Sequence, residues 1–493
     1  MCISIHYYLR ITCINIYYIP LILCIFSIIL YEISGVITGK GERFSMDRAV
    51  FADLMEWKNR RNKMPILLTG ARQVGKTWLM REFGKRCFKN TAYISFDSNP
   101  KLNQTLETTI YPAEFLPMLQ SETKTVITPE TLIVFDEIQE SPRALFSLKY
   151  FCETAPEYSV IAAGSTLGVM LHQNRPFPVG KVEFINVYPL SFFEFLDAAG
   201  EKLLADFVIK STPDKYRPFH DKLIRLLRIY FYVGGMPGVI NEYLGSGDFK
   251  KTRKAQNDIL AAYDRDFSKY ARESFSSKLR MLWQSIPSQM AKENKKFTYG
   301  AVKQGARGRD FETAVQWMQD SSLAQKVGRV KAVKPPLKAY EDFGSFKLYI
   351  NDIGLLGAMA ELDAKTISDN SALFTEFKGA LAEQFVFQEL RLSLSKKVYY
   401  WSNEKGNAEI DFLTQDSDGN VIPIEVKSGI NLRAKSLNFF IKEHSPKYCV
   451  RTSLADYKIS SPGKIIDMPL YAAANIKNIL ADGGAGYIIR KGP

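Results

Sequence analysis

The sequence predicts an α/β protein built from several domains, and three observations support this fold class. The chain has 493 residues, which is too long for one ordinary hydrophobic core. Short apolar segments alternate with helical patterns in the N-terminal part, which is typical of a parallel sheet with helices on both faces. With 46% hydrophobic and 24% charged residues, the composition is that of a globular protein.

The net charge indicates the kind of partner that the protein binds, and the cysteine content indicates its cellular compartment. The 65 basic and 52 acidic residues give a net charge of +13, which favours a polyanionic partner. The six cysteines stand at positions 2, 13, 24, 87, 152 and 449 and form no CxxC pair, and the four histidines are dispersed. This pattern argues against a disulfide framework, a zinc knuckle and a histidine-rich metal centre, and it predicts a cytoplasmic protein.

The N-terminal 45 residues form a hydrophobic extension whose role has two interpretations. Residues 11–31 contain no charged side chain and are long enough to span a bilayer, but no small-x-small cleavage site of a signal peptide follows. The segment is either a membrane anchor, with Lys40, Arg43 and Arg48 holding the following chain in the cytoplasm, or an upstream extension before a natural start at Met46. We favour the extension, and we expect membrane association only if the segment is genuine.

A glycine-rich motif predicts a phosphate-binding loop. In residues 65–80, "PILLTGARQVGKTWLM", the apolar run at 66–68 leads into Gly70-x4-Gly75-Lys76-Thr77 and then into a helical pattern. Backbone N–H groups and the helix N-terminus would hold phosphates, Lys76 would reach the β- and γ-phosphates of ATP, and Thr77 would bind Mg²⁺. The alternative to a phosphate-binding loop is a glycine turn between strand and helix. The predicted nucleotide-binding residues are Gly70, Ala71, Arg72, Gln73, Val74, Gly75, Lys76, Thr77 and Trp78.

Two acids at the end of a later strand predict the catalytic partner of this loop. "TLIVFDEIQE" is an apolar strand that ends in Asp136 and Glu137, about sixty residues after the phosphate loop. Asp136 would hold Mg²⁺ through water, and Glu137 would polarise the attacking water; alone, such acids are usually a strand cap. A further apolar strand ends in Ser165 and Thr166, which either sense the γ-phosphate or begin a helix.

Five segments together resemble a known family: "LTGARQVGKT", "LIVFDEIQESP", "AAGST", "PVGKVEFINVYPLSFFEFL" and "YFYVGGMPGVI". They are similar to prokaryotic AAA-type ATPases that carry a C-terminal domain of unknown function, over about residues 46–474. The resemblance implies an ATPase core at 46–199 and a helical lid at 200–280, and it leaves a homo-oligomer open. Many members have an arginine where this chain has Lys181, a poorer bidentate clamp, so no arginine finger is assigned. Arg265 is a candidate lid arginine, with a surface salt bridge as the alternative.

A basic middle segment at 281–360 has the outline of a winged helix. Residues 291–338 contain 11 Lys or Arg against 4 Asp or Glu. The pattern predicts a helix, a tight turn at 307–309, a second helix capped by Asp310, and two short strands, as the family resemblance also implies. The basic surface would either meet nucleic-acid phosphates, DNA rather than RNA, or only bridge neighbouring domains. The phosphate-contacting candidates are Lys303, Arg307, Arg309, Lys326 and Arg329.

The last predicted domain, 361–493, contains a hairpin that brings acids together. A turn centred on Asp418 sets Asp411 opposite Glu425 and Glu409 opposite Lys427. Two carboxylates directly across a strand pair repel each other, whereas a divalent cation between them turns the pair into a metal site. Lys427 would then orient a water or stabilise charge on a scissile phosphate. A register slip of one residue would undo this geometry.

The order helix, three strands, helix, strand from residue 377 onward resembles the PD-(D/E)XK nuclease core. The resemblance implies Mg²⁺ at Asp411 and Glu425, with Glu383, Asp411, Glu425 and Lys427 as catalytic residues, although Ile410 stands where that motif has proline. The sequence therefore predicts an ATP- and Mg²⁺-dependent AAA-type ATPase that acts on or is regulated by nucleic acid. The alternatives are a nucleotide-dependent switch whose nuclease-like domain binds without cutting and, more weakly, a membrane-tethered ATPase that acts on protein.

Overall fold

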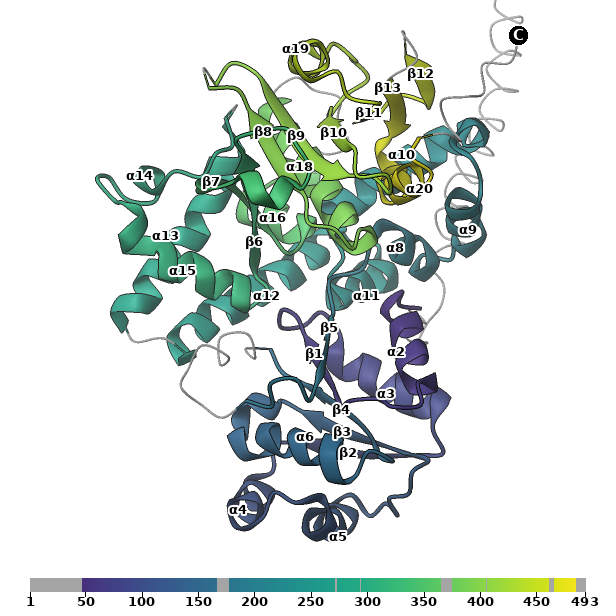
Figure 1. The fold of residues 1–493 in the computed structure, drawn as a ribbon, viewed down its shortest axis with the longest axis vertical. Coiled ribbons are helices and arrows are strands. Elements are labelled where there is room, and N and C mark those ends of the chain that lie inside the picture. Colours follow the sequence, from purple (N-terminus) through teal and green to yellow (C-terminus); the bar gives the residue numbers. More distant parts are fainter. Residues whose placement is uncertain are drawn as a thin grey trace, which may run out of the picture.

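The structure, a computed structural model, describes seven stretches of the chain: 47–165, 177–270, 273–292, 294–364, 375–404, 406–460 and 465–484. The N-terminal hydrophobic segment, Met46 and Thr166 lie outside the described residues. The described chain contains two sheets at opposite ends of the molecule, with helices between them (Figure 1).

The first sheet is parallel throughout, as predicted. Its strand order is β2-β3-β4-β1-β5, and every neighbouring pair runs in the same direction. The predicted strands at the phosphate loop, before Asp136 and before Ser165 are all present, and two strands that the sequence patterns did not single out, β2 and β5, form the edges. The strands are β1 Ile66–Thr69, β2 Asn90–Ser95, β3 Thr131–Asp136, β4 Ser159–Ala163 and β5 Glu183–Asn186.

Helices cover both faces of this sheet, because successive residues of each buried strand point to opposite sides. Leu68 belongs to the hydrophobic core shared with α2 and α3, whereas its neighbour Leu67 belongs to the core shared with α4, α5 and α6. The helices are α2 Val50–Asn59, α3 Lys76–Cys87, α4 Pro100–Thr108, α5 Pro112–Thr123 and α6 Pro142–Thr154. The short 3₁₀ helix η1 Ile138–Glu140 follows β3.

A helical region joins the two sheets, in agreement with the helical character predicted for 200–280. Its elements are α8 Phe192–Ala198, α9 Lys202–Lys210, η2 Pro213–Lys215, η3 Arg217–Phe219, α10 His220–Val233, α11 Pro237–Ser246, α12 Phe249–Tyr270, α13 Glu273–Met290, α14 Tyr299–Val302, α15 Gly308–Asp320 and α16 Ile353–Met359. Among the described residues, no single helix has the length and apolar character of a membrane span. One sharply bent pair, Arg217–Val233 with Pro237–Ser246, has both.

The second sheet has eight strands in the order β12-β13-β11-β10-β9-β8-β6-β7. The two strands predicted after the basic helices are present as β6 Ala324–Val330 and β7 Glu341–Ile350, with η4 Leu337–Tyr340 between them. They do not form a separate wing, because β6 also pairs in parallel with β8 of the C-terminal region through Arg329 and Tyr400. The basic segment and the C-terminal region therefore share one sheet.

The C-terminal region has the predicted element order and the predicted hairpin register. Ile424 pairs with Phe412 and Ile422 with Thr414, as a turn centred on Asp418 requires. The core shared with α18, η6 and α20 includes Phe412 and Ile424, whereas α19 packs on the other face. The elements are α18 Thr375–Ser393, β8 Tyr399–Ser402, β9 Glu409–Gln415, β10 Val421–Val426, α19 Lys435–His444, β11 Cys449–Ser453, β12 Lys458–Ser460, β13 Ile465–Pro469, η6 Leu470–Asn475 and α20 Ile476–Ala481.

Candidate functional sites

The phosphate loop lies between β1 and α3 and needs glycine at its two ends. Gly70 has a φ of 141°, and a Cβ there would lie 2.1 Å from the carbonyl oxygen of Val187. Gly75 has a φ of 96° and immediately precedes α3. Only glycine adopts these angles without strain, so the two glycines determine the path of the loop.

Lys76 is the buried cation of this loop. Its ammonium donates to the carbonyl oxygens of Gly70 and Ala71, each at 2.8 Å, and it belongs to no ion pair in the described part of the chain. Burial lowers the pKa of Lys76 to about 8, although Glu137 and Asp136 act in the opposite direction. A buried ammonium with no paired carboxylate gains most from an anionic ligand, and a polyphosphate is such a ligand.

Asp136, at the carboxyl end of β3, is oriented by three donors. The hydroxyls of Thr77 and Tyr93 both donate to Oδ2 at 2.7 Å, and the backbone N–H of Glu137 donates to Oδ1 at 3.0 Å. The hydroxyl and carboxylate oxygens brought together here are the donor set that Mg²⁺ prefers, so these residues fit the ion. Glu137 has a left-handed backbone, φ 48°, and accepts a hydrogen bond from the side chain of Gln139. Sequence patterns alone had not identified Tyr93.

One helix outside the first sheet, α12, and the segment before α2 contact the loop. From α12, Asp266 pairs with Arg72 at 2.6 Å, and the hydroxyl of Tyr263 donates to the carbonyl oxygen of Arg72 at 3.0 Å. Arg265, next to Asp266, is exposed. Arg48, interpreted from sequence only as a flank of the hydrophobic segment, donates to the carbonyl oxygen of Val74 at 3.0 Å. The loop is thus held from both sides by side chains distant in sequence.

The other residues considered for this site lie as follows. Lys181, at the position where the related ATPases have an arginine, pairs with Glu153 at 3.0 Å. Ser165 follows β4, and Trp78 is half-buried in the first turn of α3.

A second cluster of charged groups surrounds Glu383 on α18. Lys347, on the buried strand β7, lies 2.8 Å from Glu383, 2.6 Å from Glu409 and 3.7 Å from Asp411. Lys295 forms a further ion pair with Glu383, and the hydroxyl of Tyr349 donates to the same carboxylate. Burial alone would raise the pKa of Glu383, but the two lysines hold that pKa below its ordinary value.

The predicted hairpin acids lie at the edge of this cluster. Asp411 accepts the backbone N–H of Val426 at 2.8 Å, and Glu425 pairs with Lys427 at 2.7 Å. Glu409, expected opposite Lys427, instead pairs with Lys347 of β7, a strand that is distant in the sequence. Burial, Glu383 and Glu425 raise the pKa of Asp411, and burial raises that of Glu425 despite Lys427.

The fit of these acids to a divalent cation is incomplete. Oε2 of Glu425 is buried and has no hydrogen-bond partner among the described residues, which fits the role of a metal ligand. Against this, the amines of Lys295, Lys347 and Lys427 already offset most of the carboxylate charge. Among the described residues, no group of three or more Asp, Glu, His or Cys side chains is arranged to hold a metal. A cation here would have two carboxylate ligands, Asp411 and Glu425.

Three parts of the chain match protein families. Residues 62–196, which include the phosphate loop and Asp136, match a family described as an AAA domain. The domain that carries the phosphate loop is a P-loop ATPase domain of the AAA type. Residues 224–366 and 378–471 match two families, DUF8612 and DUF4143, each described as a domain of unknown function.

Comparison with curated proteins finds no match. Among solved structures, a Walker-type ATPase of Pyrococcus abyssi is 16% identical, with 64% of this chain and 96% of that chain covered and a TM-score of 0.40. The Aeropyrum pernix ORC1 protein, solved in complex with DNA, is 11% identical over 67% of this chain and 96% of that chain, with a TM-score of 0.28. Cdc6p from Pyrobaculum aerophilum is 12% identical over 68% and 98%, with a TM-score of 0.25. At these scores the similarities carry no argument about ligands or partners.

The basic residues downstream of the AAA-type ATPase domain fall into two groups. Lys303, Arg307 and Arg309, around the turn before α15, are exposed, and Asp310 caps α15 by accepting the N–H of Arg307 at 2.8 Å. The other two candidates make contacts within the fold. The amine of Lys326 lies 4.7 Å from the ring centre of Phe346, and Arg329 pairs with Asp342 at 2.6 Å. Three of the five predicted phosphate-binding side chains are therefore available to an external anion.

Proposed function

We propose that this protein hydrolyses ATP with Mg²⁺ and uses the nucleotide cycle to act on nucleic acid through its C-terminal half. The observation that carries the proposal is the buried ammonium of Lys76, which forms no ion pair in the described part of the chain, beside the hydroxyl–carboxylate pair of Thr77 and Asp136. This arrangement presents positive charge to a polyphosphate and oxygen ligands to its metal ion.

The residues of the AAA-type domain have separate roles in this proposal. The loop N–H groups orient the β- and γ-phosphates, and Lys76 offsets the negative charge that the phosphates bring into a buried site. Thr77 and Asp136 would hold Mg²⁺, which supplies further neutralisation of charge on the phosphate oxygens. Glu137 follows Asp136 and accepts a hydrogen bond from Gln139, so its carboxylate is positioned to orient the attacking water.

Nucleic acid is the proposed macromolecular partner, and DNA is favoured over RNA. The exposed Lys303, Arg307 and Arg309 surround the N-terminus of α15, where phosphate groups are favoured by charge and by the helix dipole. The order of helices and strands around them is that of a winged helix, although the strand pair is continuous with the second sheet. The C-terminal region has the element order of a PD-(D/E)XK nuclease core, with Glu383, Asp411, Glu425 and Lys427 in one neighbourhood.

Two versions of the C-terminal activity follow from the charged cluster. In the first, Asp411 and Glu425 hold Mg²⁺ and Lys427 assists phosphodiester cleavage, which the unpartnered oxygen of Glu425 favours. In the second, the domain binds nucleic acid without cutting, which Lys347 favours because its amine already bridges Glu383 and Glu409. We also propose a cytoplasmic location, since ATP is available there and the described cysteines, Cys87, Cys152 and Cys449, form no disulfide bond with one another.

One set of assays separates the versions. The full chain is incubated with ATP, Mg²⁺ or Mn²⁺, and supercoiled plasmid, and both phosphate release and nicking are measured. Lys76→Ala should abolish phosphate release, and Glu425→Ala should leave it intact. Nicking that disappears in Glu425→Ala supports the nuclease, whereas ATP turnover and DNA retention without nicking support the binding version. If wild type releases no phosphate above the Lys76→Ala level, the ATPase proposal is wrong.

A further inference from the structure

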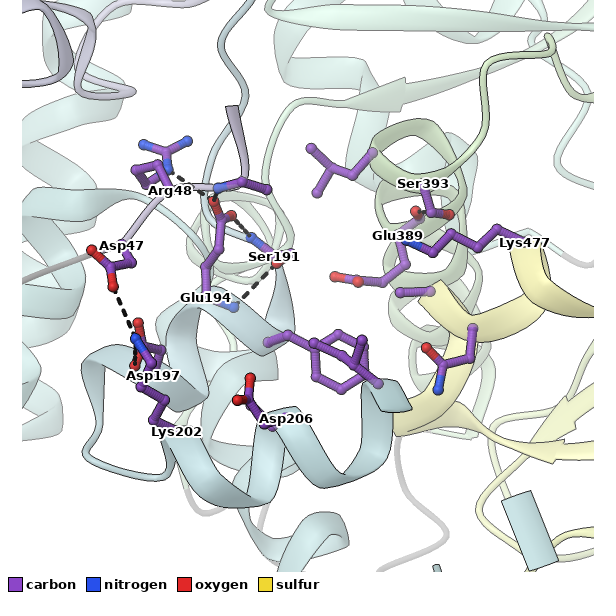
Figure 2. A pocket seen from close by; sticks show the side chains of 17 residues that line it. Asp47, Arg48, Ser191, Glu194, Asp197, Lys202, Asp206, Glu389, Ser393 and Lys477 are labelled. Atoms are coloured by element: carbon purple, nitrogen blue, oxygen red, sulfur yellow. Dashed lines mark hydrogen bonds and ion pairs between the residues drawn. The ribbon is translucent and has the colours of Figure 1, made fainter. Parts of the chain in front are cut away.

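A cavity of about 370 Å³ lies between the ATPase part and the C-terminal region, and Arg48 in its wall also contacts the phosphate loop. Its walls come from the residues before α2, from α8 and α9, and from α18, η6 and α20 (Figure 2). This volume accommodates a small organic molecule. Much of the wall is apolar, through Phe193, Ala205, Ile209, Leu392 and Ala474.

Most of the acids in the wall already have a basic partner. Glu194 pairs with Arg48 at 3.1 Å, Asp206 with Lys210 at 2.9 Å, and Asp197 with Lys202 at 3.6 Å. Asp47 pairs with Lys202 at 2.9 Å and with Arg86 at 3.1 Å. Their charges are satisfied within the protein, so they do not by themselves require a ligand.

Glu389 on α18 is different. Its side chain is directed into the cavity toward α8 (Figure 2), the residue is only 1% exposed, and one carboxylate oxygen accepts the N–H of Phe192 at 3.0 Å. No ion pair in the described part of the chain includes Glu389. Burial, and then the charge of Glu194, raise the pKa of Glu389 to about 8. A buried acid with no cation is destabilising unless it is protonated or an external cation reaches it.

We propose that the cavity binds a small organic ammonium compound, whose cationic nitrogen pairs with Glu389 and whose short hydrocarbon body packs against the apolar wall. The lining complements both halves of this ligand, because Glu389 is a buried carboxylate with no ion pair among the described residues and apolar side chains surround it. Of the basic residues in the wall, Arg48 and Lys202 are paired with acids, and Lys477 is exposed to solvent. An inorganic cation would leave the apolar wall unfilled, and a neutral molecule would leave the ionised carboxylate without a counter-ion.

The cavity is also connected to both candidate sites. Glu194 in its wall pairs with Arg48, and Arg48 donates to the carbonyl oxygen of Val74 in the phosphate loop. Glu389 lies on the same helix as Glu383, less than two turns further along. An occupant of the cavity therefore contacts elements that reach the nucleotide site and the C-terminal cluster.

The test measures binding rather than ATP turnover, so its outcome does not depend on the proposed function. The full chain is titrated with n-butylammonium chloride and, separately, with 1-butanol, and binding is followed by ligand-observed NMR at pH 8. We expect saturable binding of the ammonium compound that is at least tenfold tighter than that of the alcohol. Glu389→Gln should remove this preference, and Asp206→Asn, an acid of the same wall that pairs with Lys210, should retain it.

A second variant keeps the test decisive if Glu389→Gln does not fold. Ile209, at 37% exposure, lies at the rim of the cavity, and Ile209→Lys adds a positive charge there without removing a buried group. It should weaken butylammonium binding severalfold and leave butanol unaffected. Equal affinity for the two compounds in wild type, or full butylammonium binding by Glu389→Gln, would overturn the proposal.

Discussion

The phosphate loop and the C-terminal cluster both bury a lysine, but the groups around the two lysines shift the lysine pKa in opposite directions. Lys76 is surrounded by backbone carbonyls, and burial lowers its pKa to about 8. Lys347 lies between carboxylates, and Glu383 and Glu409 raise its pKa well above the ordinary value in spite of burial. The lysine of the first site has no ion pair among the described residues, so an anionic ligand would stabilise its charge, whereas the lysine of the second site is largely neutralised by neighbouring carboxylates.

Because of this difference, the phosphate loop gives stronger support for a bound ligand than the C-terminal cluster does. A buried cation without a counter-ion is stable only if a ligand or deprotonation relieves it, so the loop itself points to a phosphate ligand. A buried cluster of paired charges is stable without any ligand, provided that every member keeps its partners. The ammonium of Lys347 neutralises charge on Glu383 and Glu409, as a metal ion would. Among the acids of this cluster, only Glu425 has a buried oxygen with no hydrogen-bond partner in the described residues.

The largest expected effect is the loss of stability when Lys347 is replaced. Lys347→Met keeps the length of the side chain but leaves Glu383, Glu409 and Asp411 without their shared cation. The free energy of unfolding should fall by about 3–5 kcal/mol, as when one partner of a buried ion pair is removed. Urea denaturation followed by circular dichroism measures this.

The control for that experiment is Lys331→Met, which changes an exposed lysine in the same region and should leave the unfolding curve unchanged. The double variant Lys347→Met with Glu383→Leu should recover part of the loss, because fewer acids then remain uncompensated. A loss below about 1 kcal/mol for Lys347→Met would show that the cluster is solvated rather than buried.

The next largest effect concerns Lys76, whose replacement should lower activity without lowering the free energy of unfolding. Lys76→Met should lower the rate of ATP hydrolysis by about 10²–10³-fold, since a single preorganised charge contact to the reacting phosphate is lost. The free energy of unfolding without nucleotide should stay the same or rise, because no carboxylate loses a partner. Phosphate release and urea denaturation measure the two quantities. Lys85→Met, an exposed lysine of α3, should change neither.

The parts of both sites that the sequence predicted are those set by local chemistry. Gly70 and Gly75 occupy backbone conformations that other residues rarely adopt, so their spacing is readable from sequence. The turn residues around Asp418 determine the hairpin register, which pairs Ile424 with Phe412 and so brings the adjacent acids Asp411 and Glu425 close enough to interact. These features depend on a few neighbouring residues.

The parts that were missed depend on contacts between distant segments. Lys347 and Lys295 reach Glu383 from segments that were read as part of a separate basic domain, and Arg48 supports a loop 26 residues away. One signal was available: Lys347 stands between Phe346 and Leu348 in the half of β7 that is buried on both faces. A lysine in such a strand requires a carboxylate partner. The identity of that partner depends on how β7 packs against α18, which no local pattern determines.

A smaller effect extends the comparison to two acids of the same helix. Glu383 is paired with two lysines, whereas Glu389 has no ion pair among the residues that the structure describes, and burial raises the pKa of Glu389 to about 8. Between the ordinary pKa near 4.5 and this value, the folded state holds a proton that the unfolded state has lost. The stabilisation from this proton is complete below that range and is lost as the pH rises toward 8, by about 1.4 kcal/mol per pH unit.

Glu389→Gln removes this dependence, so the melting temperature of the variant relative to wild type should rise steadily from pH 5 to pH 8. Asp352, whose pKa burial raises to about 6, contributes equally to both proteins and cancels in the difference. Differential scanning fluorimetry at four pH values is sufficient, with Asp206→Asn as the matched control. A difference independent of pH would mean that Glu389 is ionised throughout, and thus already paired.

The smallest effect concerns the ion pair between Arg72 and Asp266, which links the phosphate loop to α12 across 2.6 Å. Half of the Arg72 side chain is exposed, so solvent screens this pair and its coupling energy should be only about 0.5–1 kcal/mol.

The pair also removes a positive charge from the mouth of the loop, where Lys76 is otherwise uncompensated. Asp266→Asn should therefore tighten nucleotide binding two- to fivefold, Arg72→Gln should weaken it, and the double variant should resemble Arg72→Gln alone. Titration with a fluorescent ATP analogue distinguishes this from a purely structural tie, for which both single variants would weaken binding equally.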